Sequence, residues 1–347
     1  MKDKLFKGIV LGTQIGSIAI FTALFYKLNK EQKEFKLYHN TLTNIENIKI
    51  KEYNKEVNFD SINKEELKNL FVELYNNLLN DPNVNLSNFK RNMESIKIKD
   101  IEDSELGQIY DAEAFYDYFD NEVFCNKKPN AGTLIHELIH MASTYYGEDA
   151  KHVRYCGFLQ EKFGHQIGVG ITEGYTELLS KCYFNQKKYE KYISDSYVME
   201  MTMVKNLEKI VGKDILTKLY FNSDLKGLIN ELKKYNDLES IIKFIKYLDI
   251  TALDLMHKKS KISKRKYQEY VNYCFEFLIH SYINKLRTKA FNKEIEQSEF
   301  EDKLNSFIEE LDKIEYLFCG NKKETKFISD KDIVKIVKKE EKKTNLL

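Results

Sequence analysis

Helix-breaking residues are scarce in this chain, and their scarcity limits the folds that it can adopt. Only 2 of the 347 residues are proline and 14 are glycine, so long segments contain no residue that would interrupt a helix. Hydrophobic residues make up 42% of the chain and aromatic residues 13%. That content supplies a sizeable core and excludes a wholly disordered protein. The sequence therefore predicts a predominantly helical fold.

Charge and cysteine content narrow the possible functions. The 55 basic residues nearly balance the 54 acidic ones, giving a net charge of +1. No basic footprint is present, and we therefore expect no nucleic-acid partner. The 5 cysteines are an odd number, are scattered and form no CxxC pair. This pattern favours buried, reduced thiols over a disulfide framework and leans toward a reducing compartment.

Residues 8–26, GIVLGTQIGSIAIFTALFY, form an uncharged run between two lysines. A helix of this length would span about 28 Å, close to the thickness of a bilayer core. We expect a single N-terminal membrane anchor, with a cleaved signal peptide and a buried soluble helix as alternatives. Lysines lie on both sides of the run, so the orientation of the rest of the chain stays open.

One aromatic segment departs from the helical pattern. Residues 114–126, AFYDYFDNEVFCN, place β-favouring residues on both sides of Asp120 and Asn121, which indicates a hairpin. The predicted fold class is therefore α+β and predominantly helical, with a small hairpin or sheet. Apolar periodicity predicts the helices at residues 61–80, 86–96, 189–211, 213–221, 225–235, 238–257, 263–290 and 298–318.

The most informative motif is the pattern HExxH within residues 131–145, AGTLIHELIHMASTY. His136 and His140 are four residues apart, so on a helix their imidazoles project from one face. Two nitrogens so arranged can bind one metal ion at about 2.0–2.1 Å. Glu137 would flank the ion and accept a proton from water. An ordinary helix whose histidines have other roles is the alternative.

A second motif could complete the metal site. Residues 168–183, GVGITEGYTELLSKCY, predict a helix with Glu173 and Glu177 on one face. A catalytic zinc site needs a third protein ligand and leaves a fourth position for water, and Glu173 fits that need. A ligating histidine usually donates its other N–H to a carboxylate, and Glu177 could be that acceptor. Taken alone, Glu173 would be a carboxylate stabilised at a helix start.

HELIH followed by ITEGYTELL resembles the gluzincin (thermolysin-like) zinc metallopeptidases over about residues 110–185. The resemblance implies that His136, His140 and Glu173 are the zinc ligands. It implies that Glu137 is the general base and that Glu177 is the acidic residue behind the ligands. It also implies a zincin-like domain whose metal lies between two helices and whose edge strand can pair with a peptide. An all-α C-terminal lobe would close the cleft.

The sequence does not select the residue that would stabilise the oxyanion. Gluzincins often use a tyrosine or histidine from outside the motif, and four residues are candidates: Tyr155, His152, His165 and Tyr175. Thr172 stands where the family commonly has Asn or Asp. The polar insertion at residues 146–168 is a plausible place for substrate contacts.

These patterns divide the chain into five segments: an anchor at residues 1–30, a linker at 31–60, the metal-binding domain at 61–185, a helical lobe at 186–330 and a charged tail, expected to fray, at 331–347. The sequence thus predicts a membrane-anchored zinc metallopeptidase that acts on a peptide or protein. A non-catalytic, metal-stabilised scaffold or binding protein is one alternative. A zinc hydrolase of a non-protein substrate is the other.

Overall fold

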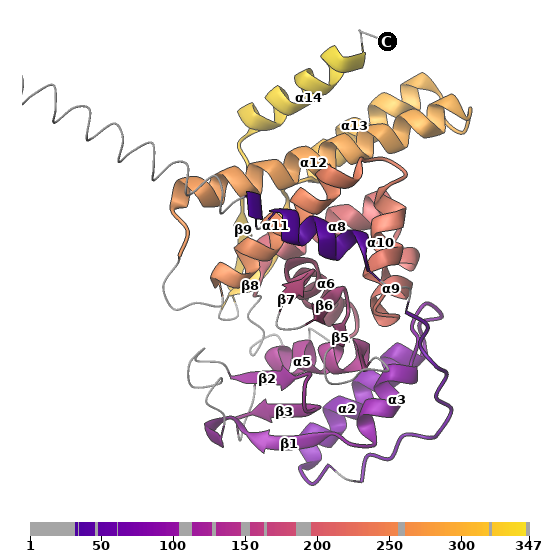
Figure 1. The fold of residues 1–347 in the computed structure, drawn as a ribbon, viewed down its shortest axis with the longest axis vertical. Helices are drawn as coiled ribbons and strands as arrows, with labels where there is room; N and C mark the ends of the chain where they lie inside the picture. The colour runs from indigo at the N-terminus through magenta and orange to yellow at the C-terminus, as the bar shows by residue number, and fades with distance from the viewer. Residues whose placement is uncertain are drawn as a thin grey trace, which may run out of the picture. The chain divides into compact units, whose positions relative to one another are not determined.

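The computed structural model describes residues 32–33, 35–45, 48–60, 62–103, 113–126, 130–146, 153–162, 165–184, 196–255, 261–318 and 321–344. The chain forms two compact units, Met1–Ile45 and Glu46–Leu347. In the first unit, residues 35–43 are helical, within the segment predicted to be a linker. The second unit carries the elements labelled in Figure 1.

The predicted membrane anchor and membrane location are corrected. Among the residues that the structure describes, no helix is both long and apolar enough to cross a membrane. The longest of them, α12 (Lys264–Phe291), carries charged residues along its whole length, which a bilayer core would not accommodate. The run at residues 8–26 lies outside the described residues, so nothing in the structure supports it as an anchor.

The second unit is predominantly helical with small sheets, which confirms the predicted α+β class. Its helices are α2 (Glu65–Leu79), α3 (Ser87–Met93), α5 (Ala131–Ser143), α6 (Val169–Cys182), α8 (Val198–Val211), α9 (Lys213–Phe221), α10 (Leu225–Leu232), α11 (Leu238–Leu255), α12, α13 (Gln297–Glu310) and α14 (Asp330–Thr344). A short 3-10 helix, η1, covers Ile101–Asp103.

The first sheet contains the predicted hairpin. Strands β2 (Ala114–Asp117) and β3 (Glu122–Cys125) pair antiparallel, and β1 (Lys97–Asp100) pairs parallel to β3. The order β1-β3-β2 makes β2 an edge strand, and α5 packs against it. Helices α2, α3 and α5 lie beside this sheet in Figure 1.

A second sheet occupies the polar insertion that the sequence left without structure. Strands β4 (Thr144–Tyr146), β5 (Val153–Cys156), β6 (Leu159–Lys162) and β7 (His165–Ile167) form an antiparallel meander in chain order. This sheet follows α5 directly and leads directly into α6. In the described residues, this sheet is therefore the connection between the two helices that carry the metal-site motifs.

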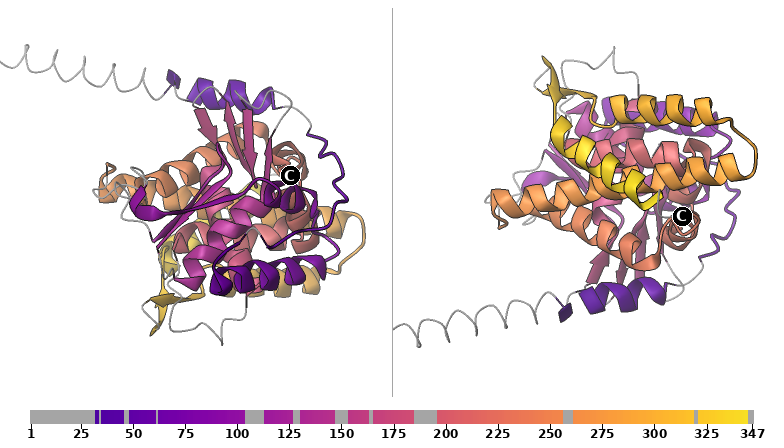
Figure 2. Two further views of the ribbon diagram at one scale, coloured as in Figure 1. Left: turned by 90° about the horizontal axis from the view of Figure 1, so that it is seen from below. Right: turned by 90° about the horizontal axis from the view of Figure 1, so that it is seen from above.

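The C-terminal helices pack around α6. Contacts run from α6 to α8 and α11, and from both of these to α12, as the two views of Figure 2 help to follow. Helix α8 approaches α6 closely at Gly174, where a Cβ atom would lie 2.5 Å from the backbone of Glu200. Only glycine allows this approach, so α6, the helix that carries Glu173, packs with its backbone close to that of α8.

Several predicted boundaries are wrong at the C-terminal end and near residue 61. The helix predicted at residues 298–318 ends at Glu310, and its last part forms strand β8 (Ile314–Phe318) paired with β9 (Asn321–Thr325). The tail expected to fray forms α14 instead. Helix α2, predicted to begin at residue 61, begins at Glu65 and has no side-chain cap.

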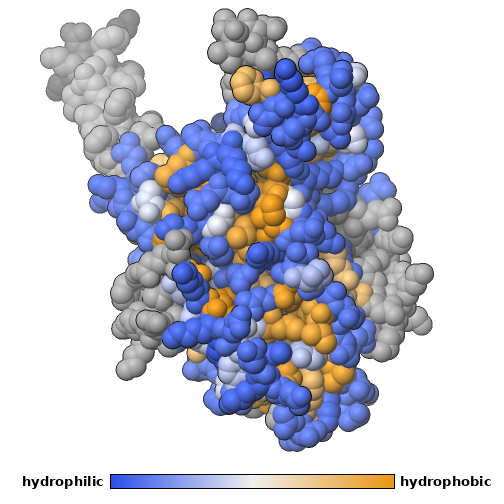
Figure 3. All heavy atoms as spheres, turned by 90° about the vertical axis from the view of Figure 1, so that its right-hand side faces the viewer, coloured by the Kyte–Doolittle hydropathy of each residue, from blue (hydrophilic) through white to orange (hydrophobic). Residues whose placement is uncertain are grey.

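Hydrophobic side chains are mainly enclosed. On the face drawn in Figure 3, hydrophilic residues surround separate groups of hydrophobic ones. The exposed large hydrophobic residues of the described chain come from seven different elements or turns, namely Leu37, Leu79, Phe119, Ile215, Leu255, Phe291 and Val334. Isolated residues of this kind are ordinary on a soluble surface.

Candidate metal centre

Helix α5 presents the HExxH residues from a buried position. The Asn130 side chain caps the helix by accepting a hydrogen bond of 2.9 Å from the Gly132 N–H. Leucine and isoleucine side chains of α5 are fully enclosed. His136 and His140 are 6% and 7% exposed, so both imidazoles are largely withdrawn from solvent. Burial of two polar rings requires partners for their nitrogens.

Helix α6 is held in place from outside the site. The Asp249 carboxylate on α11 accepts hydrogen bonds of 2.9 Å from the N–H groups of both Gly168 and Gly170 at the start of α6. These are N–H groups that a helix cannot satisfy internally, and an acidic group there is favoured by the helix dipole. This contact fixes the helix whose next turn carries Glu173.

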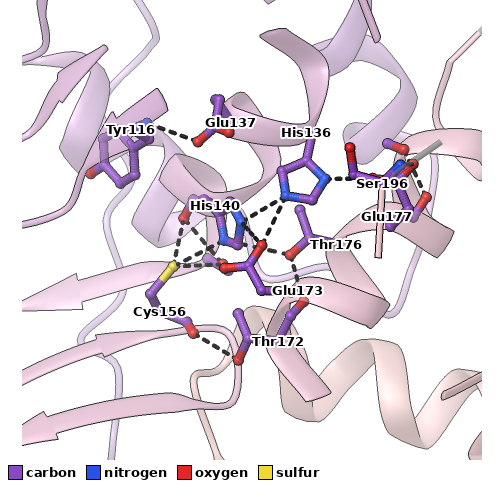
Figure 4. A network of polar contacts seen from close by, with 12 residues as sticks. Tyr116, His136, Glu137, His140, Cys156, Thr172, Glu173, Thr176, Glu177 and Ser196 are labelled. Carbon is purple, nitrogen blue, oxygen red and sulfur yellow. Dashed lines mark hydrogen bonds and ion pairs between the residues drawn. The ribbon is translucent and has the colours of Figure 1, made fainter. Parts of the chain in front are cut away.

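Three ligand atoms converge between α5 and α6 (Figure 4). His136 Nε2 lies 3.0 Å from His140 Nε2, and Glu173 Oε2 lies 3.1 Å from the first nitrogen and 3.3 Å from the second. Atoms bound to one ion at 2.0–2.2 Å lie roughly 3.0–3.4 Å apart, from octahedral to tetrahedral geometry. The buried group formed by these three residues can therefore hold a metal ion.

The second nitrogens of the two rings have partners that orient them. His136 Nδ1 donates to Glu177 Oε2 at 2.9 Å, and Glu177 Oε1 accepts from the Ser196 N–H at 3.2 Å. His140 Nδ1 faces Cys156 Sγ at 3.4 Å. With the proton on Nδ1 of each ring, both Nε2 lone pairs point to the shared position, as metal binding requires.

The charges of the metal-free cluster are strongly coupled. Burial alone would lower the pKa of His136, but hydrogen bonds to Glu173 and Glu177 raise it to about 9. The pKa of His140 is likewise raised well above its usual value, against burial, mainly by the Glu173 charge. Burial opposes ionisation of Glu173, yet the two histidines hold its pKa far below the usual range. Without a metal, protonated imidazoles are therefore favoured beside an ionised Glu173 carboxylate.

Glu137 lies on the same helix but outside the cluster. Its Oε2 accepts a hydrogen bond of 2.8 Å from the backbone N–H of Tyr116 on edge strand β2. Burial raises the pKa of its carboxyl group. Glu137 is thus a carboxylate next to the cluster, tied to the edge strand, and its raised pKa suits a proton acceptor near neutral pH.

Of the four residues considered for the oxyanion, the three that the structure describes do not gather at the cluster. The Tyr175 hydroxyl contacts Thr217 Oγ1 at 2.9 Å and Glu208 Oε1 at 3.2 Å, toward the C-terminal helices. Tyr155 on β5 is buried against the Tyr145 ring. His165 begins β7 and is exposed, and His152 lies outside the described residues.

Sequence reasoning missed Tyr197, which lies against the cluster. Its ring stacks on the His136 imidazole, with centroids 5.9 Å apart and planes 21° apart. Its backbone is left-handed, with φ 48° and ψ 38°, a costly conformation for a tyrosine. Burial, followed by the charges of Glu173 and Glu137, raises the pKa of its hydroxyl. The sequence predicted this residue only as part of a longer helix, which instead begins after it.

Sequence reasoning also missed Cys156, whose side chain lies behind His140 (Figure 4). It ends strand β5, inside the insertion for which no strands were expected. Its only sequence signal was its place among scattered, reduced thiols.

Comparison of the chain with protein-family models, with curated proteins and with solved structures finds no match. The geometry of the site therefore carries the functional argument.

Proposed function

We propose that the protein is a zinc-dependent metallopeptidase with a zincin-like metal-binding domain. One observation carries the proposal. The atoms His136 Nε2, His140 Nε2 and Glu173 Oε2 converge within 3.3 Å of one another, and a further carboxylate, that of Glu137, lies beside them on α5, the helix of the two histidines. The resemblance of the HELIH and ITEGYTELL segments of this chain to those of gluzincins supports the same assignment.

The donor set fits zinc. Two imidazole nitrogens and one carboxylate oxygen are a set that catalytic zinc sites use, with a fourth position left for water or substrate. Bound zinc would supply Lewis acidity that lowers the pKa of water and polarises a carbonyl group. Glu177 and Cys156 lie at the Nδ1 atoms of the two ligand rings, so the Nε2 atoms would face a bound ion.

Glu137 would be the general base. Its side chain is anchored by the Tyr116 N–H through one oxygen, Oε2, which leaves Oε1 to accept a proton from the attacking water. The raised pKa of Glu137 favours holding that proton and passing it to the leaving amine. Replacement by glutamine would keep the shape of the side chain and remove this proton acceptor.

A peptide substrate would bind along β2. In an antiparallel strand, the N–H and C=O of one residue point to the same side, and successive residues alternate. The Tyr116 N–H points away from β3 and toward Glu137, so the Tyr116 carbonyl and both groups of Ala114 face that same outer side. Within the described chain, no strand pairs with this edge. An extended peptide added there would lie beside Glu137.

Tyr197 is the best-placed described residue to stabilise the oxyanion. Its ring lies on His136, and the carboxylates that affect its hydroxyl most are those of the ligand Glu173 and the base Glu137. Because its pKa is raised, the hydroxyl stays protonated and can donate a hydrogen bond. Such a donor acts where negative charge develops during the reaction.

The test compares the full-length protein with its Glu137→Gln and Glu137→Asp variants. Each is assayed for zinc content and for hydrolysis of a mixed peptide library read by mass spectrometry. We expect about one zinc per chain in all three, cleavage by the wild type and loss of cleavage in Glu137→Gln. Cleavage that persists in Glu137→Gln would contradict the proposed base. A zinc-loaded, folded wild type that cleaves no peptide would favour a scaffold or a hydrolase of another substrate.

A further inference from the structure

The two histidine ligands are held by different kinds of partner. His136 Nδ1 donates to a carboxylate, Glu177, at 2.9 Å, which is a short, charge-assisted hydrogen bond. His140 Nδ1 instead faces a thiol sulfur, that of Cys156, at 3.4 Å. Sulfur hydrogen bonds are longer and weaker than those to a carboxylate. The two rings therefore differ in the acceptor behind them.

Cys156 is fixed in this position by its surroundings. It is 2% exposed and pairs in register with Thr144, the residue that follows α5. The next residue, Gly157, has φ +57°, and a Cβ atom there would lie 2.4 Å from the Tyr220 ring. Gly157 also donates to the Ser143 carbonyl at 3.3 Å. The turn after β5 thus holds the Cys156 thiol next to the C-terminal end of α5.

The thiol makes two contacts with the same residue. Its sulfur lies 3.4 Å from His140 Nδ1 and 3.5 Å from the His140 carbonyl oxygen. The S–H can therefore donate to the carbonyl while a sulfur lone pair accepts the Nδ1 proton. This two-way contact fixes the ring relative to its own backbone.

The other neighbour of His140 Nδ1 is less suited to this role. Thr176 Oγ1 lies 3.5 Å away, but its hydroxyl already donates to the Thr172 carbonyl at 2.8 Å and contacts the Tyr220 hydroxyl at 2.6 Å. These contacts occupy its proton and one acceptor position. Cys156 is consequently the nearer acceptor, and its competing contacts, to the His140 carbonyl at 3.5 Å and to Ser143 Oγ at 4.0 Å, are longer than those of Thr176.

We propose that Cys156 is a positioning residue of the metal centre, whose neutral thiol accepts the Nδ1 proton of His140 and so directs His140 Nε2 toward the ion. A thiol orients the ring without adding a further buried carboxylate to those of Glu137, Glu173 and Glu177. The proposal rests on the metal centre of the proposed function and is independent of peptide hydrolysis. It predicts that the thiol affects metal affinity and the ligand field more than it affects folding.

The test uses the full-length chain with Cys156→Ala and the conservative Cys156→Ser. The matched control is Cys274→Ala, which removes a different buried thiol, located on α12. Zinc affinity is measured by competition with a chelator, and the bound site is probed by the absorption spectrum of the cobalt-loaded protein. We expect a loss of affinity of about 10–100-fold in Cys156→Ala, with an altered cobalt spectrum. Cys156→Ser should recover most of the affinity, and Cys274→Ala should match the wild type.

Two results would overturn the proposal. One is a folded Cys156→Ala variant with wild-type zinc affinity and an unchanged cobalt spectrum. The other, which needs no variant, is an NMR spectrum of the zinc-loaded wild type in which His140 carries its proton on Nε2 and binds through Nδ1. Either result is decisive whether or not the protein cleaves peptides, so it is distinct from failure of the proposed peptidase function.

Discussion

Glu137 accepts a hydrogen bond of 2.8 Å from the backbone N–H of Tyr116, which joins the HExxH helix to the edge strand of the first sheet. The bond aligns the carboxylate beside the metal cluster with the strand edge where a peptide could pair. Strand β2 would therefore position both the Glu137 carboxylate and a substrate bound along its edge. The predictions below address the residues that build this arrangement.

Glu177→Gln should weaken zinc binding without unfolding the protein. The substitution replaces a charged acceptor of the His136 N–H by a neutral amide, and loss of such a partner typically costs about 10–100-fold in metal affinity. Competition with a chelator measures the change. Glu239→Gln, an exposed position on α11, serves as the control and should bind zinc as tightly as the wild type. Equal affinities for the two variants would contradict the role of Glu177.

Tyr197→Phe should reduce kcat while zinc content stays at about one per chain. The ring and its stacking on His136 remain, and only the hydroxyl donor is lost. Removal of one oxyanion donor costs about 10²–10³-fold in kcat. Tyr175→Phe is the matched control, since its hydroxyl contacts Thr217 and Glu208. A kcat for Tyr197→Phe within threefold of the control value would exclude the hydroxyl from the reaction.

Asp249→Asn should lower the free energy of unfolding by about 1–3 kcal/mol, because a charged acceptor of two buried N–H groups is replaced by an amide with one carbonyl oxygen. Denaturant unfolding of the zinc-free protein measures the loss. Asp214→Asn, an exposed position in the first turn of α9, should change the free energy little. If both variants lose the same amount, the contact with Gly168 and Gly170 is not what stabilises α6.

The zinc-free protein should become less stable as pH rises from about 6.5 to 9. The pKa of His136 is raised to about 9 in the folded chain, against about 6.5 in the unfolded one. The folded state therefore binds more protons in this window, and its stability is full below pH 6.5 and lost toward pH 9. Denaturant unfolding at several pH values checks this. We expect His136→Gln to reduce the slope, leaving the part that His140 contributes, and the exposed His165→Gln to retain all of it.

Zinc should reverse this pH dependence. Ligation requires both Nε2 atoms to be free of protons, so zinc affinity should rise with pH across the same window while protons are released. Calorimetric titrations in buffers with different ionisation enthalpies measure the proton count. A zinc affinity that is the same at pH 6 and pH 8 would contradict ligation by His136 and His140.

Much of the helical architecture follows from the sequence because few residues interrupt it. The helix predicted at residues 213–221 matches α9 at both ends, since Gly212 precedes it and Asn222 follows it. The hairpin at β2 and β3 was predicted from residues that flank Asp120 and Asn121, and Asn121 has the positive φ of 55° that such a turn uses.

The parts that sequence reasoning missed depend on long-range packing. The meander β4 to β7 is built from short strands with polar residues, whose partners are set by α5 and α6 on either side. Strand β8 carries an apolar pattern that also fits the last turns of a helix. Tyr197 reaches His136 only because its backbone turns left-handed before α8, and no periodic pattern records such a turn.

The candidate site was predictable where its geometry is local. The four-residue spacing of His136 and His140 places both rings on one face of a single helix. Glu173 and Glu177 could be paired with them because their own helix repeats the same spacing. Cys156 could not, because its approach to His140 depends on the register of β5 against β4.

Metal analysis of the purified full-length protein is the most direct measurement of the central claim. Zinc per chain is determined by mass spectrometry for the wild type, His136→Ala, His140→Ala and the control His165→Ala. We predict about one zinc in the wild type and in His165→Ala, and loss of zinc in the two ligand variants with the fold retained by circular dichroism. Zinc content that is unchanged in both His136→Ala and His140→Ala would contradict the metal centre and the function built on it.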